Sequence, residues 1–276
     1  MDIEINLHDS VYKSAQEYYL ASKKSKKKVE SALVVRSSLE KKLAIENEKN
    51  SVAKEKSIAK AKRPTFWFEK FYWSISTNGH LIIAGRDSTT NELIIKKYLE
   101  KDDIAFHTNI QGAAFVLLKG GSTAKEIDLQ DAALFAACFS KAWKEGFGSI
   151  DVYSMAPDQI SKTPNQGEYL AKGSFVIRGE RKWYKGVNLG LSFSLLDISN
   201  FFDSEKIYLP FAGSESAIKK NAKTDILRVL QGKLKKGDAA KKINSKFFGF
   251  LKSKNAKYLT LDDFVKQLPS GNMEIR

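Results

Sequence analysis

Apolar residues between residues 10 and 62 recur at steps of three and four, in a segment without glycine or proline. The stripe comprises Val11, Ala15, Tyr18, Val29, Ala32, Leu39 and Leu43. This spacing predicts one long, charged helix with a coiled-coil-like seam. Residues 1–7 alternate apolar and acidic positions, which is typical of a short strand or an extended segment. We therefore expect residues 1–63 to form an extended start followed by a coiled-coil-like helix.

Residues 64–189 change to short apolar runs separated by turn residues. The runs at 66–76 and 81–85 flank Asn78-Gly79 and predict a β-hairpin, because Asn-Gly fits the tight turn between antiparallel strands. Further strands are predicted at 103–109, 112–121, 149–155 and 173–179, and helices at 92–99 and 128–143. We expect an α+β domain around a mostly antiparallel sheet.

The last part of the chain, residues 190–276, follows a different pattern. Strands are predicted at 205–213 and 224–232, and helices at 214–223, 237–251 and 261–268. This order predicts a small, basic α/β module. The fold class of the whole chain is therefore α+β, with packed helices on a mostly antiparallel sheet, a long helix before it and a small α/β appendage after it.

The charge of the chain favours a polyanionic partner, because its formal net charge is +14. Residues 1–63 carry +6, residues 64–189 carry +1 and residues 190–276 carry +7. The excess thus lies in the flanks, and the aromatic-rich middle can bind nucleic acid only if its few cations converge on one face. The cluster KKSKKK at 23–28 is either a solvated helix face or an RNA contact.

Several function classes are disfavoured by what the sequence lacks. No apolar run approaches the roughly 20 residues of a membrane span, and the start has no signal-peptide pattern. The one cysteine, Cys138, lies in an apolar helical pattern and fits a core position in a reducing compartment. Phosphate-binding Walker, dinucleotide, zinc and serine-hydrolase motifs are absent. We expect a cytoplasmic protein with no cofactor, no bound metal and no membrane partner.

An enzyme alternative rests on Asp87, Glu92 and Lys96, which loosely resemble the acidic-acidic-lysine set of a metal-dependent nuclease, with His107 able to assist. Such a site needs two carboxylates and a lysine that meet at a divalent ion. The spacing does not suit adjacent strands, and an aspartate in a turn before a helix is common for capping reasons alone.

A binding interpretation draws on more of the chain. Cationic, hydroxyl and amide side chains cluster beside glycines and aromatic residues, which suits phosphate pairing and stacking on unpaired bases. The predicted RNA-binding residues are Arg86, His107, Gln111, Lys119, Ser161, Lys162, Thr163, Arg178, Arg181 and Lys182. Each alone is typical of a surface cation or a turn, so the hypothesis depends on the set.

Four ordered segments of residues 64–189 resemble the NFACT-R domain of the NFACT family. They are GRDSTTNELIIKKYL, FHTNIQGAAFVLLKGG, DLQDAALFAACFSKAW and QISKTPNQGEYLAKGSFVIRGERKWY. The flanks resemble the coiled coil and the C-terminal module of archaeal-type members. Gln111 departs from the pattern, because many members carry a histidine there, which disfavours a metal or acid–base role for this loop.

The resemblance implies a non-catalytic RNA- and ribosome-binding module of a ribosome-associated quality-control factor. The implied partners are the rRNA of large ribosomal subunits obstructed by peptidyl-tRNA, and tRNA that is recruited for C-terminal tailing of the stalled chain. The ribosome itself would make the peptide bond. No segment resembles the family's NFACT-N half, so we expect a fragment, a split gene product or a stand-alone half.

The exposed seam predicted for the long helix leaves a further alternative open. Its partner would be a second copy of the helix or the N-terminal half of the family's longer members. A dimeric coiled-coil adaptor that binds only protein is therefore the third hypothesis, beside the RNA-binding module and the nuclease.

Overall fold

The computed structural model describes residues 10–12, 15–26, 28–29, 31, 33, 36, 65–110, 112–163, 172–201, 206–254 and 259–276. By its internal contacts the chain divides into two units, residues 1–62 and 63–276. Within the described residues, no helix combines the length and apolar character needed to cross a membrane.

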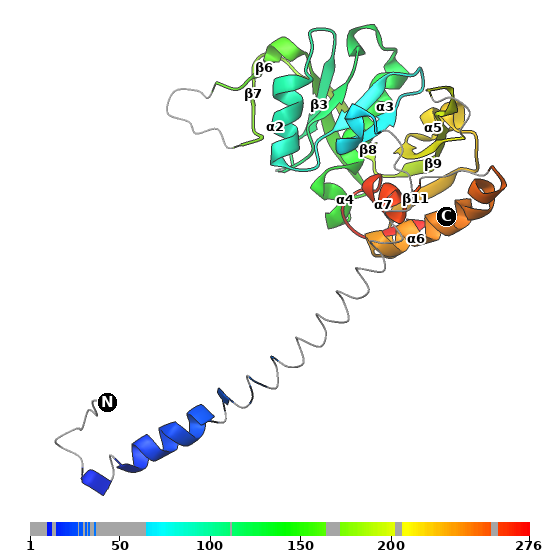
Figure 1. The fold of residues 1–276 in the computed structure, drawn as a ribbon. Coiled ribbons are helices and arrows are strands. Elements are labelled where there is room, and N and C mark those ends of the chain that lie inside the picture. The colour runs from blue at the N-terminus through cyan, green and yellow to red at the C-terminus, as the bar shows by residue number, and fades with distance from the viewer. Residues whose placement is uncertain are drawn as a thin grey trace. The chain divides into compact units, whose positions relative to one another are not determined.

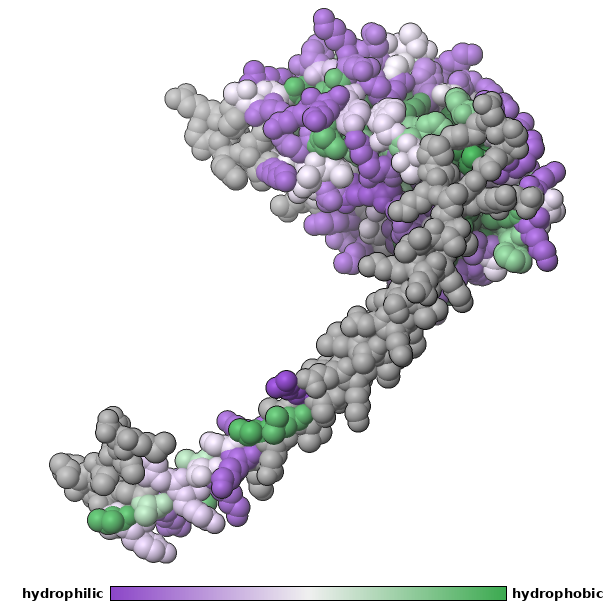
Figure 2. Space-filling model, viewed as in Figure 1, coloured by the Kyte–Doolittle hydropathy of each residue, from purple (hydrophilic) through white to green (hydrophobic). Residues whose placement is uncertain are grey.

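The first unit is helical wherever it is described between residues 11 and 36, as the apolar spacing predicts. Large apolar side chains remain exposed on this helix (Figure 2): Val11, Tyr12, Tyr18, Tyr19, Leu20, Val29 and Leu33. The predicted continuation to residue 62 and the extended segment at 1–7 lie outside the described residues.

The second unit contains three antiparallel sheets and the helices packed on them (Figure 1). The six-stranded sheet has the order β1-β2-β4-β3-β5-β8, with β1 Tyr72–Ile75, β2 Leu81–Ala84, β4 Val116–Leu118, β3 Ile104–Thr108, β5 Ser149–Met155 and β8 Lys182–Asn188. The four-stranded sheet has the order β10-β9-β11-β12, with β10 Tyr208–Gly213, β9 Leu191–Asp197, β11 Leu227–Leu234 and β12 Met273–Ile275. A third sheet pairs β6 Ile160–Ser161 with β7 Val176–Ile177.

The helices and short 3-10 turns occupy the connections between these strands. The α-helices are α2 Ser88–Lys97, α3 Glu126–Cys138, α4 Lys141–Glu145, α5 Glu215–Asn221, α6 Lys236–Ser253 and α7 Leu261–Lys266. The 3-10 turns are η1 Trp67–Lys70, η2 Gly121–Thr123, η3 Pro157–Gln159 and η4 Ser199–Phe201. The α+β class with mostly antiparallel sheets is confirmed.

Alternation along the strands gives the six-stranded sheet two buried faces, because successive side chains point to opposite sides. On β3, Phe106 belongs to the cluster that contains α3, and Ala105 belongs to the cluster that contains Ile94 of α2. Helices α3 and α2 therefore cover opposite faces of this sheet (Figure 1). The start of α2 lies at the end of the sheet where β2 ends and β4 begins.

The C-terminal segment shares the core on the α3 side. Helix α6 buries Ala239, Ile243 and Phe247 at steps of four residues, and these side chains join the same cluster as α3. Strand β9 follows β8 after Leu189 and Gly190, so the chain passes directly from the six-stranded sheet to the four-stranded one. The division into separable domains 64–189 and 190–276 stays a prediction.

Three local predictions need correction. The first strand begins only at Tyr72, because Glu69 accepts a hydrogen bond from the Phe66 backbone N–H and closes a 3-10 turn there. The helix predicted at 128–143 is two helices, since the Ser140 hydroxyl caps α4 and bonds to the Ala137 carbonyl at 2.7 Å. The strand predicted at 173–179 shrinks to the two residues of β7. Strands β6, β8, β9 and β12 were not predicted.

A glycine and an asparagine fix the turn between β2 and α2. The Gly85 N–H donates to the Phe115 carbonyl at 3.1 Å, and a Cβ at position 85 would lie only 1.8 Å from Oδ1 of Asn91. Asn91 uses that oxygen to accept from the Phe115 N–H at 3.0 Å, while its amide nitrogen donates to the Ala113 carbonyl at 3.4 Å. The side chain of Asn91 thus occupies the space that position 85 leaves open.

Replacing Gly85 with alanine is expected to lower the free energy of unfolding by at least about 1–3 kcal/mol, because the new methyl group overlaps the Asn91 amide. Urea denaturation of the full chain measures this change. The control is Gly249→Ala, since Gly249 lies in α6 with open space around it and should gain about 0.5–1 kcal/mol of stability from the helix-favouring residue. Equal stability of Gly85→Ala and the wild type would contradict this packing.

Candidate nucleic-acid interface

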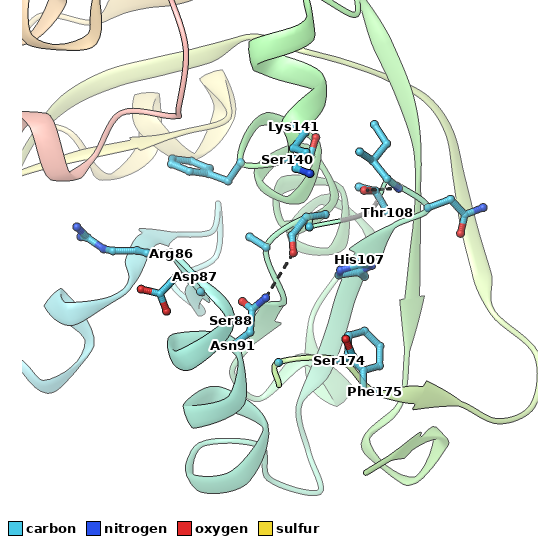
Figure 3. Close-up of a pocket in the computed structure, with 18 of the residues that line it drawn as sticks. Arg86, Asp87, Ser88, Asn91, His107, Thr108, Ser140, Lys141, Ser174 and Phe175 are labelled. Atoms are coloured by element: carbon cyan, nitrogen blue, oxygen red, sulfur yellow. Dashed lines mark hydrogen bonds between the residues drawn. The ribbon is translucent and has the colours of Figure 1, made fainter. Parts of the chain in front are cut away.

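A cleft of about 560 Å³ opens where the start of α2, the β3–β4 loop, the start of α4 and residues 172–177 meet. Figure 3 shows Arg86 and Asp87 on one side, His107 and Thr108 on the other, and Lys141 at a third edge. The lining combines cations with the aromatic rings of Tyr72, Phe139, Tyr153 and Phe175. These elements are far apart in sequence, so the fold creates the site.

Arg86 is held in place by the backbone that precedes β1. Its Nη2 donates to the carbonyl oxygens of Phe71 at 2.9 Å and Glu69 at 3.4 Å, and its guanidinium lies 4.8 Å from the centre of the Tyr72 ring. Its Nε is buried without a hydrogen-bond partner. Burial lowers the pKa of Arg86. The guanidinium is thus positioned by carbonyl groups that do not neutralise its charge.

Asp87 is the N-cap of α2. Its carboxylate accepts from the Thr90 backbone N–H at 2.8 Å, and this bond is the main cause that lowers the pKa of Asp87. The Thr90 hydroxyl oxygen in turn accepts hydrogen bonds from the backbone N–H groups of Arg86 and Asp87. The Arg-Asp pair of the turn is therefore held in one conformation by the helix start.

His107 lies on β3 against two aromatic side chains. Its Nδ1 is 3.2 Å from the Tyr153 hydroxyl, and its ring meets Phe175 edge-on with centres 5.2 Å apart. Burial is the main cause that lowers the pKa of His107, and the charge of Arg181 adds to the effect. The imidazole is therefore neutral at pH 7, which suits hydrogen bonding to a base or hydroxyl better than phosphate pairing.

The cations that line the cleft form no ion pair within the described part of the chain. They are Arg86, Lys141, Lys144, Lys172 and Arg181, and Asp87 is the one acidic side chain in the described lining. Arg181 lies 4.7 Å from the centre of the Tyr153 ring. Asp87 acts electrostatically on Arg86 and Lys172, but five cations against one carboxylate leave a positive excess in a concave site, which favours an anionic ligand.

Three predicted RNA-binding lysines have carboxylate partners instead. Lys119 donates to Asp103 at 2.7 Å and Glu100 at 2.8 Å, and the neighbouring Gly120 N–H donates to Asp103 at 2.9 Å. Lys162 contacts Glu92, and Lys182 contacts Glu126 at 2.8 Å. The structure does not place these ammonium groups in the cleft, and their role in RNA contact stays a prediction.

The remaining predicted positions lie around the cleft or outside the described residues. The Ser161 hydroxyl accepts from the Thr163 backbone N–H at 3.1 Å and shapes the turn beside Lys162. Arg178 is exposed, and its backbone N–H donates to the Gln159 carbonyl at 2.8 Å. Gln111 lies outside the described residues. Of the ten predicted positions, the structure brings Arg86, His107 and Arg181 together in the cleft.

Two residues of the nuclease alternative have structural roles: Asp87 caps α2, and Glu92 joins α2 to Lys162 and Gly173 in contacts that we call the Glu92 clamp. Glu92 accepts from Nζ of Lys162 at 2.5 Å, from Nζ of Lys96 at 2.9 Å and from the Gly173 N–H at 3.0 Å. These contacts, led by the bond from Lys162, lower the pKa of Glu92 to about 2. Across the described residues, no group of three His, Cys, Asp or Glu side chains is placed to hold a metal ion.

Sequence reasoning missed Lys141, Lys144 and Lys172. Two of them lie beside a feature that the sequence does show, since Lys141 comes directly after Ser140 and Lys172 precedes Gly173. The Gly173 backbone packs on the first turn of α2, where an added Cβ would lie 2.7 Å from the Ser88 carbonyl. Lys141 and Lys172 lie in the quoted motifs and Lys144 directly follows one, which was the available signal, but their convergence required the fold.

A family of known domains matches the part of the chain that supplies most of the cleft lining. Residues 70–179 match the family described as the NFACT protein RNA binding domain, so this part of the chain is similar to that domain. The chain is also homologous to ribosome quality control proteins. The archaeal Rqc2 homolog aRqcH of Methanocaldococcus jannaschii is 48% identical over 153 residues, which are 54% of this chain and 22% of that protein.

Human and bacterial proteins extend the comparison. The ribosome quality control complex subunit NEMF of Homo sapiens is 38% identical over 191 residues, 67% of this chain and 17% of that protein. The chain thus spans about a fifth of the length of these curated relatives. A solved C-terminal structure of the fibronectin/fibrinogen-binding protein from Streptococcus suis aligns with a TM-score of 0.37 and 22% identity, over 46% of this chain and 47% of that one.

The Glu92 clamp predicts a pH-dependent contribution to stability. Because the folded pKa of about 2 lies below the ordinary value of 4.5, the clamp stabilises the fold above pH 4.5 and is lost as the pH falls toward 2. Glu92→Gln should lower the free energy of unfolding at pH 7 by roughly 1–3 kcal/mol, and the difference from the wild type should shrink below pH 4.

Urea denaturation at several pH values measures this difference. The matched control is Glu100→Gln, because Glu100 also faces a lysine but its side chain is 74% exposed, and an exposed pair contributes at most about 1 kcal/mol. A Glu92→Gln effect that is constant from pH 7 to pH 3 would show that the carboxylate charge does not carry the clamp.

Proposed function

We propose that this chain is a non-catalytic RNA- and ribosome-binding module of a ribosome-associated quality-control factor. The family match over 70–179 supports RNA binding, and the names of the homologous proteins support the ribosome quality control setting. The observation that carries the proposal is the cleft, where five cations without carboxylate partners converge on one concave surface of the described fold.

Several cations outside the cleft have carboxylate partners. Lysines on α2, α5 and α7 form ion pairs with acids one turn away: Lys96 with Glu92, Lys219 with Glu215 and Lys266 with Asp262. Cleft residues such as Lys141 and Lys172 have no such partner in the described part of the chain. Phosphate groups are the anions of RNA, and they would neutralise these charges on binding.

The shape and lining of the cleft suit an unpaired stretch of RNA. Its volume of about 560 Å³ lies in the range of sites that enclose small ligands, so a splayed-out nucleotide fits. Phe139 and Phe175 provide apolar surface for a base, and the cations at the edges reach toward the backbone phosphates. His107 and Asn109 add polar side chains for base or sugar contacts.

Within the ribosome, the module would engage large subunits that carry peptidyl-tRNA and support tRNA recruitment for C-terminal tailing. In this account the ribosome makes the peptide bond, so the chain needs no catalytic group of its own. The role of Glu92 as a clamp between Lys162 and Gly173 supports that division of labour, because its carboxylate is occupied by structural partners.

Removing two cleft cations should weaken RNA binding without unfolding the protein. Lys141→Ala/Lys172→Ala is expected to reduce affinity for a tRNA transcript roughly ten-fold near 0.1 M salt, because two phosphate contacts are lost. The slope of log affinity against log salt should fall by about 0.7–0.9 per contact. Fluorescence anisotropy over a salt series measures both quantities.

The control removes the same charge elsewhere. Lys101 and Lys219 are exposed and do not line the cleft, so Lys101→Ala/Lys219→Ala should retain affinity within about two-fold. RNA recovered after incubation with magnesium should be intact. Equal losses in both double variants would mean that bulk charge, and not the cleft, binds RNA, and cleavage would favour the nuclease alternative.

A further inference from the structure

The ring of Tyr72 carries a second cation besides Arg86. Nζ of Lys236 lies 5.5 Å from the ring centre, and the Arg86 guanidinium lies 4.8 Å from it. Tyr72 and Arg86 line the cleft and belong to the segment that matches the family. Lys236 is the first residue of α6, far beyond residue 179. Two distant parts of the chain thus bring their charges to one aromatic side chain.

This arrangement is electrostatically unfavourable in the free protein. Burial, followed by the charge of Arg86, lowers the pKa of Lys236 to about 8. Within the described residues Lys236 forms no ion pair, and the carboxylates that act on Arg86 have other partners: Asp87 caps α2, and Asp262 contacts Lys266 at 2.6 Å. The two cations therefore lie near the same ring, and no ion pair of the described residues neutralises Lys236.

The place of Lys236 on its helix adds to the cost. The N-terminal end of an α-helix carries partial positive charge and favours acidic side chains. Helix α6 has 18 residues, and it begins with Lys236 directly after Lys235 as its N-cap residue. The start of α6, burial and the charge of Arg86 all disfavour the ammonium group of Lys236. Its position therefore suits an anionic ligand that the free protein does not contain.

A phosphate fits the two groups chemically. A guanidinium and an ammonium are the two side-chain cations that pair with phosphate oxygens, the first in a fixed planar fork and the second as a point charge. Nε of Arg86 is buried and Nη2 donates to carbonyl oxygens, so Nη1 is the remaining guanidinium nitrogen and has no partner among the described residues. Arg86 and Tyr72 line the cleft beside Lys141 and Lys144, and Lys236 lies outside this lining but within 5.5 Å of the Tyr72 ring centre, so a strand that leaves the cleft past Tyr72 passes both cations.

We propose that Arg86 and Lys236 together bind one backbone phosphate of the RNA in the cleft, so that α6 completes a site begun by the family domain. The inference rests on the proposed RNA-binding function and adds a contact outside residues 70–179. It assigns α6 a direct part in binding, in addition to its packing on the four-stranded sheet.

The test compares three variants of the full chain in binding to a tRNA transcript. Lys236→Met should weaken binding about three- to ten-fold and lower the salt slope by about 0.7–0.9, with no loss of thermal stability, because an unfavourable charge has been removed. Lys236→Arg should bind nearly as the wild type. Lys235→Met removes an exposed neighbouring charge and should retain affinity within two-fold.

The pH dependence gives a readout that a packing role would not change. Wild-type affinity should fall as the pH rises through about 8, where Lys236 loses its charge. Lys236→Arg should remove this fall while Arg86, Tyr72, Asp87 and Asp262 stay in place. Equal affinity of Lys236→Met and the wild type at every pH would overturn the inference.

The outcomes separate this inference from the function on which it rests. If Lys141→Ala/Lys172→Ala weakens binding and Lys236→Met does not, the cleft binds RNA without α6. If the wild type does not bind the transcript, the proposed function and the inference both fail. A titration with inorganic phosphate forms the second arm. Stabilisation of the wild type by free phosphate to the same extent as by the transcript would overturn the assignment to an RNA backbone.

Discussion

The hydrogen bonds that Asn91 makes with the β3–β4 loop are the constraint on which the cleft depends. They hold the Ala113 carbonyl and the Phe115 N–H against the first turns of α2, in space that only glycine at position 85 leaves open. One residue further along, Glu92 holds Lys162 and Gly173 to the same helix. Helix α2 thus joins the end of the six-stranded sheet, the β3–β4 loop and the residues around Gly173 on the far side of the cleft. Glu92, which belongs to the set that resembles a catalytic site, therefore has a structural role in holding the cleft together.

Charge pairing then decides which cations are available to a ligand. The middle region is almost neutral in sequence, yet its charges are not evenly matched in space. Lys119 and Lys182 meet carboxylates, whereas Lys141, Lys172 and Arg181 line a concave surface with Asp87 as the acid in its described lining. A domain of low net charge can therefore present a strongly cationic site, and the basic flanks need only supply long-range attraction.

The sequence predicted what depends on neighbours along the chain. The Asn78-Gly79 hairpin and the antiparallel character of the sheet follow from local patterns, and the structure confirms them. The helix predicted at 92–99 exists, but α2 begins four residues earlier, at Ser88, after Asp87 as its N-cap. The sequence could not show that Asp103 pairs with Lys119, or that Glu92 pairs with Lys162, which lies 70 residues further along, because such ion pairs form only in the folded chain. For the same reason Lys141 and Lys172 were overlooked, although both lie in the motifs that revealed the family. Ser140, which separates α3 from α4, was a local signal for a helix start, but the apolar pattern of residues 128–143 continues across it.

The central claim is that RNA contacts concentrate in the cleft and not on the basic flanks. Cross-linking of a 4-thiouridine-substituted tRNA transcript to the full chain, followed by peptide mapping, tests it most directly. The account predicts cross-links at 107–112, 141–144 and 172–181, the segments that surround His107 and the unpaired cations. Cross-links confined to residues 10–36 and to the outer faces of the C-terminal helices would contradict it.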